Sequence, residues 1–275
     1  MKAVEELFAH PQYSLNNSTK RELLLSGLNE LSKFHFDNSV HYRHLISNLG
    51  INLSKGFSSI EEISFIPVRL FKTQIIQSIP DNAVFKVLTS SGTTNQQVSR
   101  IVLDKETSML QVKALASIIT SYIGPQRLPM IILDSETTIK NRSSLSARGA
   151  GLVGLSNFGR NHFFALDENM ELKIDGLIEF IDNYKADNIL IFGFTFMIWQ
   201  YFYLKLKYIN KKINLENAFL IHSGGWKKLA EQSVSNKIFK ESLHEQFKIK
   251  RVYNFYGMVE QVGSIFMECF VLFVF

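Results

Sequence analysis

Residues 88–95 read LTSSGTTN, a group of serine and threonine hydroxyls around one glycine that directly follows the apolar run of residues 83–88. Gly92 permits a turn with positive φ, and successive N–H groups in such a turn form a concavity that binds anions. The serine and threonine hydroxyls add hydrogen-bond donors that carry no charge. Because the glycine spacing and the lysine of the Walker loop are absent, this is not a P-loop. Ordinary surface loops contain the same residue types, so a plain solvent turn remains the alternative.

Two further glycine-containing turns occur near the C-terminus: IHSGGW at residues 221–226 and YNFYGMVE at residues 253–260. Each contains or follows a short apolar run that predicts a strand. Glycines at strand ends expose backbone at the carboxyl edge of a sheet, where open α/β sheets bind their ligands. The hydroxyl-rich turn, the glycine pair and the Tyr-Gly-x-x-Glu turn, in this order, resemble the phosphate, adenine and magnesium motifs of adenylate-forming enzymes, which activate carboxylic acids.

Four other strings narrow this resemblance: IPVRLFK at 66–72, RLPM at 127–130, SARGAG at 146–151 and FGFTFMIW at 192–199. With YGMVEQ at 256–261 they resemble the acyl-protein synthetase family, the LuxE-type long-chain-fatty-acid–protein ligases of bacterial luminescence. The resemblance runs from about residue 15 to about residue 269. It implies an α/β fold with layered sheet and helices, like the N-terminal domain of adenylate-forming enzymes, and an additional N-terminal helical layer.

Length, composition and charge bear on the number of domains and argue against nucleic-acid binding and a membrane span. The 275 residues are 46% hydrophobic, enough for one large domain or two small ones. The net charge of +5 arises partly from lysines in 205–212 and 227–251, which we interpret as solvated helix faces, because no motif that reads nucleic acid accompanies them. The most apolar stretch, 189–204, is shorter than the roughly 20 residues of a membrane span.

The single cysteine, Cys269, excludes an internal disulfide and a multi-cysteine metal site, and we expect it to be a buried strand residue. Glu5 and Glu6 interrupt the segment where a signal peptide would be apolar, so we expect a cytoplasmic protein. The apolar tail of residues 270–275 suggests either a shortened reading frame, without a C-terminal lid domain, or a buried last strand that continues residues 265–267.

Hydrophobic periodicity predicts helices at 19–36 and 40–48, with Ser18 or Thr19 capping the first. From residue 83 onward, apolar runs at 98–103, 130–133, 189–192, 219–221 and 252–255 alternate with helical patterns at 104–122, 174–184, 196–209 and 227–247. This alternation predicts α/β layers. We expect residues 1–80 to form a helical layer packed on an α/β nucleotide- and acyl-binding domain at 81–275, in a single structural unit.

The resemblance assigns roles to particular residues. The β- and γ-phosphates of ATP would be held by a hydroxyl-rich set with one basic residue: Ser90, Ser91, Gly92, Thr93, Thr94 and Arg100. Adenine would occupy a slot lined by glycine backbone and aromatic faces: Gly224, Gly225, Trp226, Asn254, Tyr256 and Gly257. Core packing is the alternative for the two aromatic residues.

Two further residues complete the implied site. Glu260 lies where the superfamily places its magnesium-binding carboxylate. A carboxylate suits this role because magnesium prefers oxygen ligands. The alternative is that Glu260 is an ordinary surface glutamate. Arg148 has glycines nearby that leave its guanidinium free to meet a carboxylate or phosphate, with a surface loop arginine as the alternative. Glu260, Arg148 and Thr93 are the expected catalytic residues.

The resemblance implies that ATP and Mg²⁺ activate a long-chain fatty acid to an acyl-adenylate, whose acyl group passes to a protein thiol and supplies a fatty acid reductase subunit. Two alternatives remain open at this point. The chain is a shortened remnant that only binds nucleotide, acyl group or a reductase partner, or it is a ligase for a different carboxylic acid.

Overall fold

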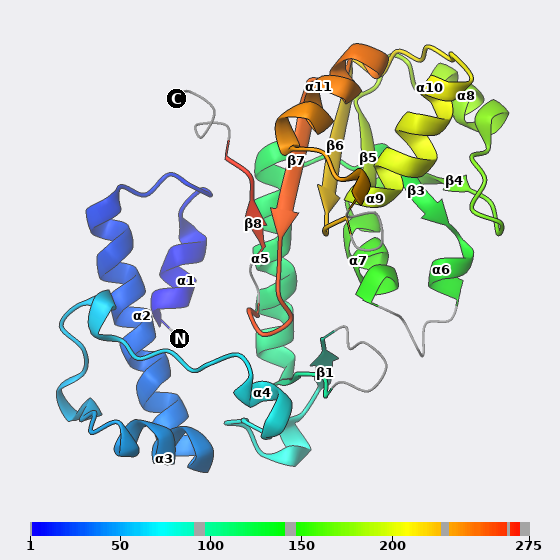
Figure 1. Ribbon diagram of the computed structural model, residues 1–275. Helices are drawn as coiled ribbons and strands as arrows, with labels where there is room; N and C mark the ends of the chain where they lie inside the picture. The colour runs from blue at the N-terminus through cyan, green and yellow to red at the C-terminus, as the bar shows by residue number, and fades with distance from the viewer. Residues whose placement is uncertain (1, 91–96, 141–146, 227–230, 263–264, 270–275) are drawn as a thin grey trace. The chain divides into compact units, whose positions relative to one another are not determined.

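The computed structural model describes residues 2–90, 97–140, 147–226, 231–262 and 265–269 (Figure 1). The chain divides into two compact units, residues 1–118 with 258–264 and residues 119–257 with 265–275. This division differs from the ranges 1–80 and 81–275 expected from the sequence, and the number of independently folding domains stays a prediction. Within the described ranges, no helix is both long and apolar enough to span a bilayer.

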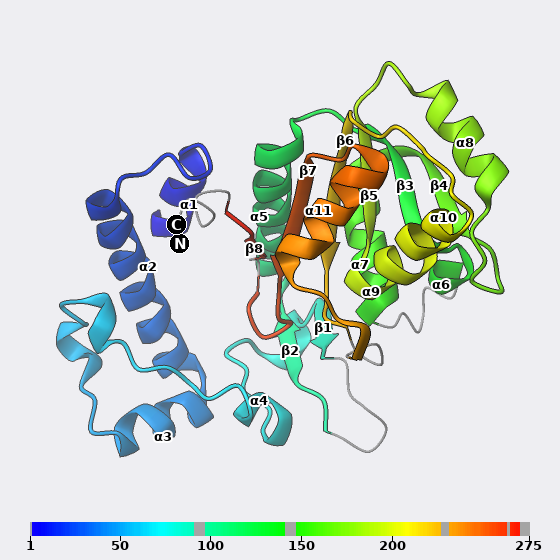
Figure 2. The ribbon, with the colours of Figure 1, turned by 45° about the horizontal axis from the view of Figure 1, so that its top comes forward.

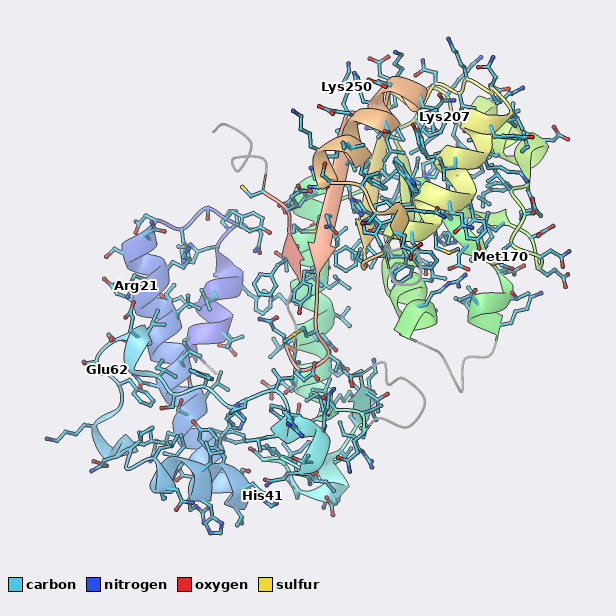
Figure 3. All side chains as sticks on the ribbon, in the orientation of Figure 1. Arg21, His41, Glu62, Met170, Lys207 and Lys250 are labelled. Atoms are coloured by element: carbon cyan, nitrogen blue, oxygen red, sulfur yellow. The ribbon has the colours of Figure 1, made fainter. Side chains whose placement is uncertain are left out.

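Helices dominate the first unit: α1 (Lys2–Ala9), α2 (Asn17–Asn38), α3 (Val40–Asn48), α4 (Leu70–Thr73) and the 3₁₀ turns η1 (Leu53–Lys55), η2 (Ile60–Glu62) and η3 (Asp81–Ala83). The cap of α2 is Asn16, whose Oδ1 accepts from Thr19 N at 2.9 Å, so the expected Ser18 or Thr19 cap is wrong. Arg21 of α2 forms an ion pair with Glu61. Figure 3 labels Arg21 and Glu62, the residue that follows Glu61.

The hydroxyl-rich stretch begins at the end of a β-hairpin in the first unit. Strand β1 (Lys86–Thr89) pairs antiparallel with β2 (Arg100–Leu103). The pairing continues past the strands, because Ser90 N donates to Ser99 O at 3.1 Å and Ser99 N donates to Ser90 Oγ at 2.9 Å. Helix α5 (Lys105–Ile123) follows, and Asp104 caps it as expected, since its Oδ1 accepts from Thr107 N at 2.7 Å.

The second unit is built on a six-stranded sheet with the order β4-β3-β5-β6-β7-β8. Its strands are β3 (Leu128–Ser135), β4 (Gly159–Leu166), β5 (Ile189–Phe194), β6 (Ala218–Ser223), β7 (Arg251–Tyr256) and β8 (Phe266–Met267). All neighbours pair in parallel except β7 and β8. The carboxyl ends of the parallel strands therefore share one edge of the sheet.

Helices cover both faces of this sheet (Figures 1 and 2). They are α6 (Thr137–Lys140), α7 (Ala147–Ser156), α8 (Ile174–Asn183), α9 (Thr195–Met197), the π-helical η5 (Ile198–Leu204), α10 (Lys205–Tyr208) and α11 (Asn236–Phe247). An extensive apolar cluster lies between the sheet and α8, η5 and α11, and it includes the fully buried Phe202, Phe239 and Phe247. The sequence-based α/β layering is confirmed.

Two expectations about elements are wrong. The helix expected from residue 227 begins at Asn236, where Ser235 Oγ accepts from Ile238 N at 3.3 Å; residues 227–230 lie outside the described ranges. The helix expected at 196–209 is instead three consecutive pieces, α9, η5 and α10, with a π-helical centre. Strand β4 was not anticipated, because polar residues fill its first half.

Candidate functional site

The sheet register brings the glycine pair and the Tyr-Gly turn to the same edge. Gly193 of β5 lies opposite His222 of β6, which lies opposite Asn254 of β7. Gly224 and Tyr256 each lie two residues further along β6 and β7, at the carboxyl ends of these neighbouring strands. The expected adenine-slot residues, far apart in sequence, are therefore spatial neighbours at this edge.

The two glycines of the pair differ in what the fold requires of them. Gly224 has a φ of +79°, and a Cβ there would lie 3.1 Å from Phe194 Cδ1. Both features favour glycine. Gly225 is exposed, has no positive φ, and a Cβ there would meet no described heavy atom within 4 Å. The fold therefore gives no reason for glycine at 225, whereas close approach of a ligand to the backbone would give one.

A buried threonine holds the turn that contains this pair. Thr195 Oγ1, at the start of α9, lies 2.7 Å from Gly224 O, 3.2 Å from Ser223 O and 2.9 Å from His222 Nδ1. Thr195 is 7% exposed and His222 is 2% exposed. Burial, with a smaller contribution from the positive charge of Lys240, lowers the pKa of His222 to about 3, so the ring is neutral near pH 7.

The expected aromatic residues have different surroundings. The half-buried ring of Trp226 contacts Trp199 and Phe239 edge-on, at centroid distances of 5.7 and 6.3 Å. Trp226 thus borders the apolar core. Tyr256 is 60% exposed at the end of β7. The backbone of Asn254 pairs with Glu268, since Glu268 N donates to Asn254 O at 2.8 Å. Stacking of either aromatic ring on a base stays a prediction.

Arg148 lies on helix α7, not in a glycine-flanked loop, and it forms an ion pair with Asp134 at the end of β3. Arg148 Nε donates to Asp134 Oδ2 at 2.5 Å, and Nη2 donates to Oδ1. Asp134 also accepts from Ser135 N and Thr138 Oγ1, each at 2.7 Å. The Sδ atom of Met170, labelled in Figure 3, lies 3.8 Å from Arg148 Nη2. Sequence reasoning missed Asp134, although it directly follows the apolar run of residues 130–133.

The remaining expected residues belong to the first unit or lie outside the described ranges. Ser90 closes the hairpin, and exposed Arg100 lies opposite Thr89 in the register. Glu260 is half-buried in a turn closed by Gln261 N and Met258 O at 3.1 Å. Four expected phosphate-loop residues lie outside the described ranges: Ser91, Gly92, Thr93 and Thr94. Their convergence with the glycine pair on one ligand stays a prediction.

A family model for "Acyl-protein synthetase, LuxE" matches residues 7–271. The chain belongs to the acyl-protein synthetase family. Cys269 is exposed just after β8, so the expectation of a buried strand residue is wrong. A comparison with curated proteins finds no match.

Solved structures similar to this chain include 2-hydroxyisobutyryl-CoA ligase in the postadenylation state with 2-HIB-AMP (TM-score 0.64, 14% identity). The same ligase with 2-HIB-AMP and CoA in the thioesterification state gives a TM-score of 0.63 at 16% identity. The alignments cover 90% of this chain and 50–51% of those chains. This likeness confirms the expected fold, and the chain spans about half the length of these ligases.

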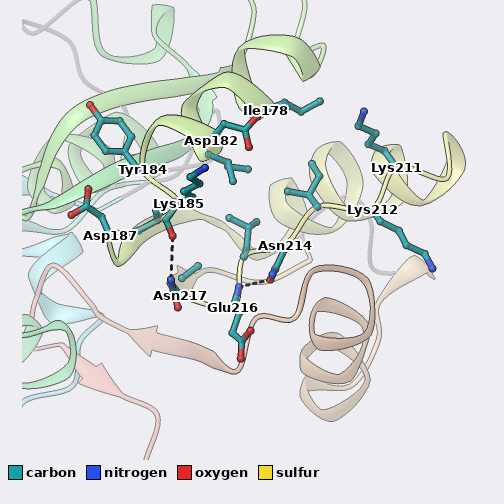
Figure 4. A pocket seen from close by; sticks show the side chains of 15 residues that line it. Ile178, Asp182, Tyr184, Lys185, Asp187, Lys211, Lys212, Asn214, Glu216 and Asn217 are labelled. Carbon is teal, nitrogen blue, oxygen red and sulfur yellow. Dashed lines mark hydrogen bonds between the residues drawn. The ribbon is translucent and has the colours of Figure 1, made fainter.

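A cavity of about 430 Å³ lies away from the glycine pair, beside Ile189 and Ala218 at the amino ends of β5 and β6 (Figure 4). Its charged lining does not converge on one point, since the side chains of Lys211 and Lys212 point in different directions. Because ligands of open α/β sheets bind at the carboxyl ends of strands, we do not assign the nucleotide to this cavity.

Acid should destabilise the folded chain partly through His222. Between a folded pKa of about 3 and the ordinary 6.5, the unfolded state binds the extra proton, so stability falls as the pH falls below 6.5. We expect a loss of about 2 kcal/mol between pH 7.5 and pH 5 from this residue alone. The His222→Asn variant should lack that part of the loss in urea unfolding at the two pH values. Equal losses in both proteins would contradict the assignment.

Proposed function

We propose that this chain uses ATP to activate a carboxylic acid, and that the acid is a long-chain fatty acid. The observation that carries the proposal is the open space over Gly225 at the carboxyl edge of the sheet, in a member of the acyl-protein synthetase family with the fold of an adenylate-forming ligase. An unhindered backbone beside the exposed face of Tyr256 suits a flat base such as adenine.

In the proposed reaction, a carboxylate oxygen attacks the α-phosphorus of ATP, the bond to the β-phosphate oxygen breaks, and pyrophosphate leaves. The reactants carry like charges, so the protein contributes positioning and electrostatic stabilisation. We assign the β- and γ-phosphates to Ser90, Ser91, Thr93, Thr94 and Arg100. The hairpin supports this assignment, because its last described backbone pair, Ser90 and Ser99, lies on either side of residues 91–96 in the sequence.

Magnesium fits the residue proposed to hold it. The Glu260 carboxylate makes no hydrogen bond or ion pair with any residue that the structure describes, so its oxygens remain available to a hard cation. Bound magnesium would neutralise negative charge on the phosphates. No cluster of three metal-ligating side chains occurs in the described ranges.

The acyl group would then pass to a thiol: a thiolate attacks the acyl carbon, the bond to the AMP oxygen breaks, and AMP leaves. Family membership supports a protein thiol as acceptor and a fatty acid reductase subunit as partner. We do not assign Cys269 as that thiol, because it follows Glu260 closely in sequence. The proposed compartment is the reducing cytoplasm, where an acceptor thiol stays free.

ATP–pyrophosphate exchange with tetradecanoate tests this proposal. We expect acid- and magnesium-dependent exchange by the folded chain. Absence of exchange with every acid in a panel of fatty, aryl and sugar-linked carboxylates would leave only the alternative of a binding remnant, and exchange with a non-fatty acid alone would reassign the substrate.

Titration of the folded chain with ATP tests the role of Gly225. A methyl group there should raise the Kd for ATP about tenfold through steric crowding of the base, without loss of stability. Gly154→Ala is the matched control, since a methyl group at Gly154 on α7 would also have no described heavy atom within 4 Å. Equal ATP affinity in Gly225→Ala and Gly154→Ala would show that adenine does not bind at this edge of the sheet.

A further inference from the structure

We propose that Thr195 and His222 are positioning residues that fix the glycine-pair turn in the shape that accepts the nucleotide. This inference rests on the proposed function. Neither residue was assigned a role from the sequence, and both are buried behind the turn. Thr195 reaches Gly224 from a different element, at the start of α9, so a single hydroxyl ties β6 to the end of β5.

The hydrogen atoms in this cluster can be assigned. The carbonyl oxygens of Ser223 and Gly224 only accept, so the Thr195 hydroxyl donates to one of them, and the shorter distance, 2.7 Å, favours Gly224 O. A hydroxyl has one hydrogen. His222 Nδ1 must then donate to Thr195 Oγ1 across 2.9 Å. His222 is therefore the neutral tautomer with hydrogen on Nδ1, and its buried Nε2 has no described hydrogen-bond partner.

The packing around the turn explains why the hydrogen bond from Thr195 to the Gly224 carbonyl is needed. Gly224 has a positive φ, and the ring of Phe194 lies against it, so the turn approaches β5 closely. Phe194 also lies 3.5 Å from a methyl position at Gly151 of α7. A glycine pair has high backbone freedom. A buried bond to the Gly224 carbonyl restricts that freedom and leaves the backbone of Gly225 facing open space.

The neutral state of His222 belongs to the same arrangement. Its ring contacts Phe239 of α11 at a centroid distance of 4.8 Å, and the groups facing it include Lys240, whose positive charge opposes a second positive charge. Lys240 is itself paired with Glu268 at 2.8 Å. Near pH 7, His222 is therefore neutral and donates from Nδ1 to Thr195 Oγ1.

The test compares Thr195→Val, which removes the hydroxyl at nearly constant volume, with Thr195→Ser, which keeps it. We expect Thr195→Val to raise the Kd and KM for ATP about tenfold with a smaller change in kcat, and Thr195→Ser to stay within about twofold of the unchanged protein. Thr73→Val, on α4, controls for the substitution itself. Equal Kd values for the Val and Ser variants would overturn the proposal, even if Thr195→Val lowers the melting temperature.

A second readout works without nucleotide. Hydrogen exchange of the ligand-free chain should be at least about tenfold faster across 223–226 in Thr195→Val than in Thr195→Ser. If the unchanged chain does not bind ATP, the proposed function fails, and hydrogen exchange alone tests whether Thr195 fixes the glycine-pair turn. Faster exchange in Thr195→Val than in Thr195→Ser supports that role, and equal exchange in the two variants contradicts it. If Thr195→Val does not fold, two variants of His222 provide the same comparison. His222→Asn keeps an N–H at the Nδ1 position, and His222→Leu lacks it.

Discussion

Arg148→Met should lower the free energy of unfolding by about 3–5 kcal/mol, because it leaves a buried carboxylate without its cation. The Asp134 side chain is 1% exposed and that of Arg148 is 27% exposed, so water can replace little of the lost interaction. Ser135 N and Thr138 Oγ1 would still donate to Asp134, but neither carries charge. Urea unfolding followed by circular dichroism measures the effect.

Arg160→Met is the matched control for this prediction. Arg160 pairs with Asp187 at 3.5 Å, and both side chains are more than 40% exposed, so the same substitution there should cost less than about 1 kcal/mol. Losses that agree within about 1 kcal/mol in the two variants would show that the Arg148 pair is not a buried structural contact. Arg148 would then be free to bind substrate, as the sequence alone suggested.

Glu260→Gln should lower magnesium-dependent turnover by at least about ten- to hundredfold, because an amide cannot replace a charged oxygen ligand. The fold should be unaffected, since no described residue forms a hydrogen bond or ion pair with the carboxylate. ATP–pyrophosphate exchange measured across a magnesium titration gives the rate and the apparent magnesium affinity separately.

The control for Glu260 is Glu241→Gln on α11, whose carboxylate is 57% exposed and forms only a loose pair with Lys237 at 3.9 Å. This variant should keep the rate and magnesium dependence of the unchanged protein. A Glu260→Gln variant indistinguishable from Glu241→Gln would exclude Glu260 as the magnesium ligand and return it to the role of an ordinary surface glutamate.

Elements with local signals could be predicted from the sequence. Helix α3 has the expected bounds, Val40–Asn48, because Ser39 caps its start and Gly50 adopts a positive φ just after it. Strands β5, β6 and β7 were found from their apolar runs, and the parallel register then placed the two C-terminal motifs together. Local chemistry and the geometry of parallel strands were sufficient for this part of the site.

The parts that failed depend on tertiary contacts. No helix was expected at residues 147–156, yet α7 forms there and contacts the ring of Phe194 at Gly151. Asp134 and Thr195 each act on a partner in another element, so no spacing in the sequence reveals them. Strand β4 lies at the end of the sheet order, next to β3, and its exposed Asn161 and His162 hide the alternation expected of a strand.

The central claim is that nucleotide binds at the carboxyl ends of β5, β6 and β7. Hydrogen exchange of the full chain, with and without ATP and magnesium, tests it most directly. The account predicts slower exchange at 222–226 and 254–257 on binding, with 211–217 at the opposite cavity unchanged. Slower exchange at 211–217, with none at the glycine pair, would contradict it.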